Sequence, residues 1–218
     1  MNYYIVCEGE KTELLVYSNW IPTLNSSLVK VDSFLELNQN NFYMISGCGY
    51  PNYFNIITNS VMDIIDNNIN AILIIIVDAE DFTFEEKYKE INDFLENKFR
   101  NFSNYKIIVQ TPSMEGWCLG NRRFISNSPQ SETLTELITH YNVRKNEPEN
   151  ILPYQDNNKA QTSTKYLKEA AKEKNVTYSK ARPNIISDVS FLTNLKKRCE
   201  LTNHLSSFKK FTEIFETN

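Results

Sequence analysis

Short apolar runs separated by periodic segments dominate the first half of the chain. Four runs rich in β-branched residues predict strands, at positions 3–7, 42–45, 71–77 and 106–109. The run 71–77 is apolar throughout, which is typical of a strand buried on both faces of a parallel sheet. Apolar residues with helical spacing lie between the runs, at 10–19, 53–65 and 84–99. This alternation predicts parallel strands joined by right-handed crossovers.

The second half carries helical patterns only. Helices are expected at 128–141, with Ser131 as the candidate N-cap, at 163–174, and along two apolar stripes near 191–195 and 208–215. We therefore expect an α/β fold: a Rossmann-like core over residues 1–125, with a parallel four-stranded sheet flanked by helices. Residues 126–218 are expected to form a helical, basic C-terminal extension packed on that core.

Composition supports a folded protein without a membrane span. Of the 218 residues, 41% are hydrophobic and 23% charged, which permits a packed core and argues against disorder. The longest apolar run, 71–77, is far shorter than the ~20 residues that a membrane helix needs. No basic leader or small-residue cleavage site follows Met1, so we expect a cytoplasmic protein.

The sequence lacks the residue patterns that several kinds of metal binding and catalysis require. The four cysteines are widely spaced and form no C-x-x-C pair, which disfavours a structural zinc site. Only two histidines are present, so a nucleophile activated by histidine has little support. No G-x-x-x-x-G-K-[ST] motif occurs, so the chain supplies no P-loop of its own. Any catalysis is therefore expected to depend on carboxylates.

Charge is divided unevenly along the chain. The formal net charge is -4, but residues 1–158 carry -10 and residues 159–210 carry +8. Grouped acids attract metal cations, and a basic segment neutralises phosphates. Both segments are also explained by ordinary solvated helix faces.

Acidic residues come directly after two of the predicted strands. Glu8 comes directly after the first strand, in the stretch Glu8–Glu13, and Asp78, Glu80 and Asp81 follow the third strand. Ligands of open α/β sheets bind outside the carboxyl ends of the strands. Carboxylates gathered there suit Mg²⁺ or Mn²⁺. For Glu10, Glu13 and Asp81, helix capping is the competing explanation.

Both acidic stretches resemble one known family. A strand ending in Glu-Gly, here 5–9, and a later apolar strand ending in an Asp-x-Asp-like element, here 75–81, resemble the TOPRIM domain of topoisomerases, bacterial primases and OLD-family nucleases. The stretch 6–13 is most similar to small RloB-like and OLD-like stand-alone TOPRIM proteins of phage-defence loci. The stretches 112–119 and 178–180 extend that narrower resemblance thinly toward the C-terminus.

The resemblance implies a set of site residues. Glu8, Glu13, Asp78, Glu80 and Asp81 are the expected metal ligands, and the expected catalytic residues are Glu8, Asp78, Glu80 and Lys180. The family's Asp-x-Asp appears here as Asp78-x-Glu80 with Asp81 beside it, which leaves the second ligand open between Glu80 and Asp81. Glu115 is an additional candidate.

Basic residues supply candidates for nucleic-acid contacts. Arg122 and Arg123 follow the Glu115-Gly116-Trp117 stretch, and Lys180 and Arg182 lie in the basic segment. Such residues contact the nucleic-acid backbone in many complexes, although a solvated surface pair explains Arg122 and Arg123 equally well.

The leading hypothesis is a Mg²⁺- or Mn²⁺-dependent nuclease that acts as an effector of an anti-phage defence system, with an ABC-type ATPase as partner. The alternative is a non-catalytic TOPRIM regulatory or scaffold subunit that docks on a partner ATPase. A topoisomerase or primase is disfavoured because the additional domains are missing. DNA, tRNA and other RNA remain open as substrates.

Overall fold

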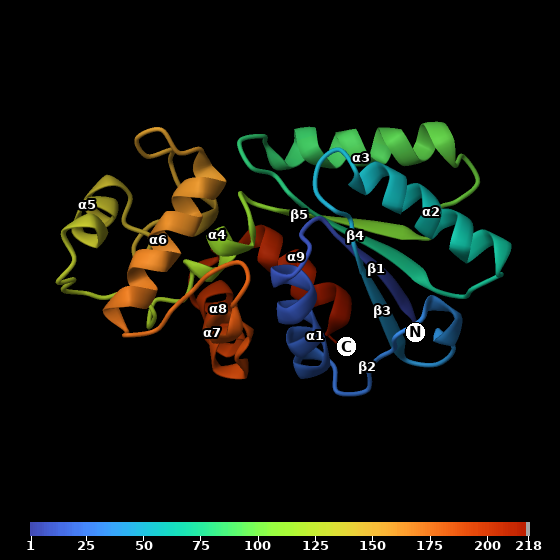
Figure 1. The fold of residues 1–218 in the computed structure, drawn as a ribbon, viewed down its shortest axis with the longest axis horizontal. Coiled ribbons are helices and arrows are strands. Elements are labelled where there is room, and N and C mark those ends of the chain that lie inside the picture. The colour runs from blue at the N-terminus through green and yellow to red at the C-terminus, as the bar shows by residue number, and fades with distance from the viewer. Residues whose placement is uncertain (217–218) are drawn as a thin grey trace. The chain divides into compact units, whose positions relative to one another are not determined.

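The computed structural model describes residues 1–216 (Figure 1). Contacts within the chain divide it into two compact units. The first unit comprises Met1–Val77 and Glu85–Val109, together with the chain end from Phe215. The second unit comprises Asp78–Phe84 and Gln110–Ile214, so it is assembled from two separate stretches of sequence.

A five-stranded parallel sheet forms the centre of the first unit, which confirms the predicted α/β class. The strands are β1 (Tyr3–Cys7), β2 (Val29–Lys30), β3 (Asn41–Ser46), β4 (Ile72–Asp78) and β5 (Tyr105–Gln110). Their order across the sheet is β2-β3-β1-β4-β5. Four of these strands were predicted. The sheet has five strands rather than four because β2 adds two exposed residues at one edge, and these carry no alternating pattern.

Strand β1 lies in the middle of the sheet and pairs in parallel with β3 and with β4. Cys7, the last residue of β1, is opposite Ile76 of β4. The backbone N–H of Glu8 continues this pairing, donating to the carbonyl of Ile76 at 2.9 Å. Since β4 ends at Asp78, the predicted placement of Glu8 and Asp78 at the carboxyl ends of neighbouring parallel strands is confirmed.

Three helices cover this sheet: α1 (Thr12–Leu24), α2 (Tyr53–Asp66) and α3 (Phe84–Lys98). Figure 1 shows α2 and α3 on one face and α1 on the other, as right-handed crossovers in opposite directions from the central strands require. The apolar stripes of these helices are buried with the sheet, including Trp20 of α1, Ile57 of α2 and Leu95 of α3. A short 3-10 helix, Phe34–Glu36, precedes β3.

Helices make up most of the second unit. They are α4 (Met114–Cys118), α5 (Glu132–His140), α6 (Lys159–Glu173), α7 (Asn184–Ser187), α8 (Val189–Thr202) and α9 (Ser206–Phe215), with a 3-10 helix at Pro148–Asn150. The predicted cap of α5 is confirmed, since the Ser131 hydroxyl accepts a hydrogen bond from Leu134 N–H at 3.3 Å. The short helices α4 and α7 were not predicted.

One buried carboxylate holds the start of α9. Glu149, only 6% exposed, accepts hydrogen bonds from the N–H and hydroxyl of Ser207 and from Phe208 N–H. The carboxylate thereby satisfies N–H groups that have no acceptor within the helix. Burial of Glu149 nevertheless outweighs the hydrogen bonds, so that the pKa of this carboxyl group is raised. No helix among residues 1–216 has the length and apolar character that a membrane span requires.

Candidate metal and phosphate site

Two of the predicted acidic ligands, Glu8 and Glu13, lie in the first unit. Glu8 is half-buried, and its negative charge contributes to raising the pKa of Tyr53, after burial and the charge of Glu90. Glu13 is 5% exposed, and its carboxylate accepts a hydrogen bond from Gly9 N–H. A Cβ at position 9 would lie 2.5 Å from Oε2 of Glu13. A larger residue at position 9 would therefore require the end of the Glu13 side chain to shift.

The other predicted acids are Asp78, at the end of β4, and Glu80 and Asp81 in the loop that follows; all three belong to the second unit. Asp78 is half-buried, and Glu80 and Asp81 are exposed. Glu80 has a φ of +54°, a left-handed conformation that residues other than glycine adopt rarely. Its backbone N–H donates to the carbonyl of Pro112 at 2.8 Å, which holds the loop in this conformation.

Glu80 and Asp81 have different surroundings. Oδ1 of Asp81 accepts a hydrogen bond from the backbone N–H of Lys159 at 3.1 Å. Lys159 is the first residue of α6, so Asp81 satisfies one of the free N–H groups at the start of this helix. The carboxylate of Glu80 has no hydrogen bond or ion pair with residues 1–216 and instead lines a hollow. The position of Asp81 is thus explained by helix capping, and the helix that it caps, α6, lies far along the chain.

Helix α6 presents one apolar and one polar face. Its buried residues include Tyr166 and Leu167. Four polar residues with helical spacing line the hollow that Glu80 also lines: Gln161, Thr164, Lys165 and Lys168. Asn158 caps the helix, since its side chain accepts from Gln161 N–H at 2.8 Å while the Gln161 side chain accepts from Asn158 N–H. The capping box fixes where the polar face begins.

These elements enclose a depression with a volume of about 560 Å³, which we call the mixed-charge hollow. Its charged lining consists of two carboxylates, Asp78 and Glu80, and three lysines, Lys165, Lys168 and Lys180. All five belong to the second unit. Carboxylates suit a hard cation and lysines suit phosphate oxygens. The hollow therefore has groups for both a metal ion and a phosphate.

The buried carboxylate of Glu115 lies close to the ammonium group of Lys180. Oε1 of Glu115 accepts a hydrogen bond from the Tyr178 hydroxyl at 2.8 Å, and Oε2 accepts one from the Ser113 hydroxyl at 3.1 Å. Nζ of Lys180 lies 4.0 Å from Oε1 of the same carboxylate. Burial, and next the charge of Glu115, raise the pKa of Tyr178, so its hydroxyl stays protonated and donates. The candidate residue Glu115 thus lies beside Lys180 and forms an ion pair with it.

The predicted nucleic-acid contacts lie in two places. Lys180 lines the mixed-charge hollow, whereas Arg122 and Arg123 line a different depression of the second unit. Nε of Arg122 donates to the carbonyl of Arg144 at 2.9 Å, so this side chain also has a structural role. Arg182 is exposed, and its backbone N–H closes a turn on Ser179 at 2.9 Å.

The side chains that line the mixed-charge hollow fit Mg²⁺ better than a metal that requires many protein ligands. Among residues 1–216, no group of three or more His, Cys, Asp or Glu side chains is arranged to hold a metal ion. The hollow offers two carboxylates together with the amides of Asn157, Asn158 and Gln161. Mg²⁺ in phosphate-processing sites is commonly bound through one or two carboxylates, with water and substrate phosphate completing its shell. The five-carboxylate ligand set stays a prediction.

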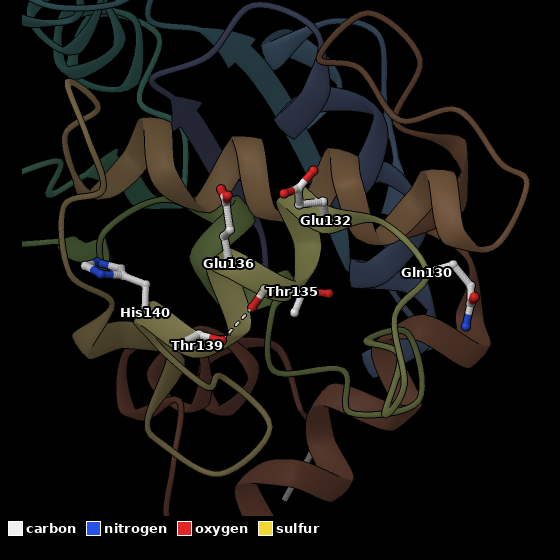
Figure 2. A pocket seen from close by; sticks show the side chains of 6 residues that line it. All are labelled: Gln130, Glu132, Thr135, Glu136, Thr139 and His140. Carbon is white, nitrogen blue, oxygen red and sulfur yellow. Dashed lines mark hydrogen bonds between the residues drawn. The ribbon is translucent and has the colours of Figure 1, made fainter.

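A second depression, the α5 hollow, has a volume of about 570 Å³ and lies along one face of α5 (Figure 2). Glu132 and Glu136 project to the same side of the helix. Tyr154 donates its hydroxyl hydrogen bond to Glu136 at 2.8 Å, and Nε2 of His140 lies 2.9 Å from the carbonyl of Pro153. Since the protein itself supplies partners for Glu136 and His140 and the hollow lacks lysine and arginine, it is a weaker candidate for phosphate chemistry.

Lys165 and Lys168 were not predicted as site residues from the sequence. Their spacing with Gln161, opposite the apolar stripe of α6, is visible in the sequence. A polar face with this spacing is also common on helices exposed to solvent, however. What distinguishes α6 is the bond from its N-terminus to Asp81, which no local pattern indicates.

No protein-family model, curated protein or solved structure matches this chain.

Proposed function

We propose that the protein is a Mg²⁺- or Mn²⁺-dependent nuclease that hydrolyses phosphodiester bonds at the mixed-charge hollow. One observation carries this proposal: Asp78 and Glu80 share the hollow with Lys165, Lys168 and Lys180. Hydrolysis of a phosphodiester requires a group that activates water and positive charge around the phosphate oxygens. Acids and lysines lining one depression are suited to both tasks.

The carboxylates and the lysines of the hollow are assigned different tasks because of their chemistry. Asp78 and Glu80 would hold the divalent ion, which when bound lowers the pKa of a coordinated water and stabilises the charge on the phosphate. Lys165, Lys168 and Lys180 would bind the phosphate oxygens of the substrate. Glu115 would act as a positioning residue for Lys180. The sequence resemblance also implies Glu8, which lies in the first unit, as a ligand or proton acceptor.

Lys165 is held in place by its surroundings. Its Nζ donates to the side-chain carbonyl of Gln155 at 3.0 Å and lies 5.0 Å from the ring centroid of Tyr154. Neither partner is a carboxylate, so the positive charge of Lys165 is not cancelled by them. A cation held by neutral partners suits a site that binds phosphate without a large reorganisation cost.

The experiment that tests this proposal is cleavage of labelled tRNA, single-stranded DNA and duplex DNA with Mg²⁺ or Mn²⁺. The wild-type protein is compared with Asp78→Ala, Glu8→Ala and a control, Glu132→Ala, which removes an exposed carboxylate from the α5 hollow instead. We expect activity in the wild type and the control, and its loss in Asp78→Ala and Glu8→Ala. Equal activity in all four proteins would exclude the proposed site.

The cellular role that we propose, an effector of anti-phage defence with an ABC-type ATPase partner, rests on the sequence resemblance alone. The cleavage assay is therefore run with and without the ATPase encoded next to the gene, if one is present. Tight binding of that ATPase without cleavage under any condition would favour a non-catalytic scaffold subunit.

A further inference from the structure

A third, smaller depression of the second unit has a positively charged lining. It has a volume of about 160 Å³, and we call it the basic hollow. Its lining includes Arg122, Arg123, Lys197 and Arg198, together with Asn194, and contains no carboxylate. The volume lies below the ~300–1,000 Å³ typical of pockets for drug-sized ligands, so a small anionic group suits it better than a whole nucleotide.

Backbone carbonyls hold the two inner arginines in place. Arg198, 3% exposed, donates to the carbonyls of Arg144, Val143 and Asn146 at 3.1, 3.1 and 2.8 Å. Arg122 donates through Nε to the carbonyl of Arg144. A neutral carbonyl fixes the direction of a guanidinium group and leaves its net charge in place. The carbonyls therefore orient the arginines without cancelling their charge.

Glu147 is the acidic residue whose charge acts on Arg198, and its effect on the pKa is smaller than those of burial and of Arg122. Within residues 1–216, none of Arg122, Arg123, Lys197 and Arg198 forms an ion pair with a carboxylate. Burial, followed by the charge of Arg122, lowers the pKa of Arg198 to about 10. Like charges placed this close repel one another, and a bound anion would relieve the repulsion.

From this lining we infer that the basic hollow binds a phosphate group. Arg122 supplies terminal guanidinium nitrogens, since only its Nε is engaged by residues 1–216. Arg123 and Lys197 are exposed and add charge at the rim. Guanidinium groups match phosphate oxygens in geometry and charge. The phosphate belongs either to a nucleic-acid strand or to a small phosphorylated molecule, and this site operates independently of cleavage at the mixed-charge hollow.

The first test measures thermal unfolding of the full-length protein in sodium phosphate and in sodium chloride of equal ionic strength. Arg123→Ala/Lys197→Ala is compared with Lys30→Ala/Lys106→Ala, which removes two exposed cations from the first unit. Phosphate should raise the Tm of the wild type and the control by mass action. The rise should fall by at least half in Arg123→Ala/Lys197→Ala. An equal rise in all three proteins would overturn the inference.

The second test identifies the source of the phosphate. Binding of a 5′-phosphorylated single-stranded oligonucleotide is compared with that of its 5′-hydroxyl counterpart. Weaker binding of both in Arg123→Ala/Lys197→Ala, but not in the control, assigns the site to backbone phosphates, and weaker binding of the phosphorylated strand alone assigns it to a terminal phosphate. Unchanged binding of both strands, with the phosphate-dependent Tm rise lost, assigns it to a free phosphorylated molecule. Asp78→Ala should keep the Tm rise, so failure of this inference and of the nuclease proposal are distinguishable.

Discussion

Nζ of Lys180 lies 4.0 Å from Oε1 of Glu115, a carboxylate whose side chain is 3% exposed. The lysine itself is 66% exposed, so this is an ion pair between a buried anion and a cation at the surface. Pairs with an exposed partner contribute little to stability. The arrangement matters more because it limits where the ammonium group of Lys180 can be.

Glu115→Ala should destabilise the protein more than Glu115→Gln. In the alanine variant the buried hydroxyls of Tyr178 and Ser113 both lose their acceptor, at about 1–3 kcal/mol for each buried donor left without a partner. Glutamine keeps one acceptor oxygen and should retain part of that stability. Urea unfolding of the two variants checks the order, and equal losses would show that the hydrogen bonds of Glu115 are unimportant.

A metal-binding measurement should distinguish the role of Glu80 from that of Asp81. If Asp78 and Glu80 hold the ion, Mg²⁺ or Mn²⁺ should raise the Tm of the wild type, and Asp78→Ala and Glu80→Ala should each abolish the rise. Asp81→Ala should keep the rise while losing about 0.5–2 kcal/mol of stability, as for other lost helix caps, because α6 loses the acceptor of Lys159 N–H. A metal response unchanged in Asp78→Ala would place the ion elsewhere.

The lysines of the mixed-charge hollow should determine the salt dependence of nucleic-acid binding. Replacing Lys168 or Lys180 with alanine should weaken binding and reduce the slope of log K against log salt by about one unit for each lost phosphate contact. Lys106→Ala, an exposed lysine of β5, is the control and should leave the slope unchanged. The measurement is fluorescence anisotropy across a salt series, and identical slopes in all variants would contradict the assignment.

Glu149 should make stability depend on pH. Burial raises the pKa of this carboxyl group above its ordinary value of 4.5 in the folded protein, so the folded state binds the proton more tightly than the unfolded state. The contribution of Glu149 is therefore fully present below the unfolded pKa and is lost as the pH rises through the folded pKa.

Glu149→Gln carries no titrating group at this position and serves as the reference. The difference in unfolding free energy, wild type minus Glu149→Gln, should fall as the pH rises above 4.5 and then level off. Urea unfolding of both proteins over this pH range measures the difference. A difference that increases with pH would show that the hydrogen bonds from Ser207 and Phe208 outweigh the burial of Glu149.

Features with a strong local pattern were predicted from the sequence. The apolar runs gave the four longer strands, and Ser131 was placed correctly as the cap of α5. Strand β2 was missed because two exposed residues have no periodicity, and α4 because all five of its residues are buried.

The candidate site was less predictable, for a physical reason. Asp78 ends a buried strand, so its position at the carboxyl end of the sheet could be predicted from local sequence. Choosing between Glu80 and Asp81 required knowing that Lys159, 78 positions later, meets one of them. The same long-range contact is needed to recognise Lys165 and Lys168 as part of the hollow. Contacts between such distant segments depend on the whole fold and leave no periodic signal.

The discontinuous second unit limits how this protein can be cut or recombined. A fragment that begins at Gln110 would keep the lysines of the mixed-charge hollow and lose Asp78 and Glu80, both of its carboxylates. It would also lose Asp81, the acceptor at the start of α6. A break anywhere between residues 84 and 110 therefore separates the carboxylates of the hollow from its lysines: the loop at 78–84 and the segment from 110 onward must be inherited together.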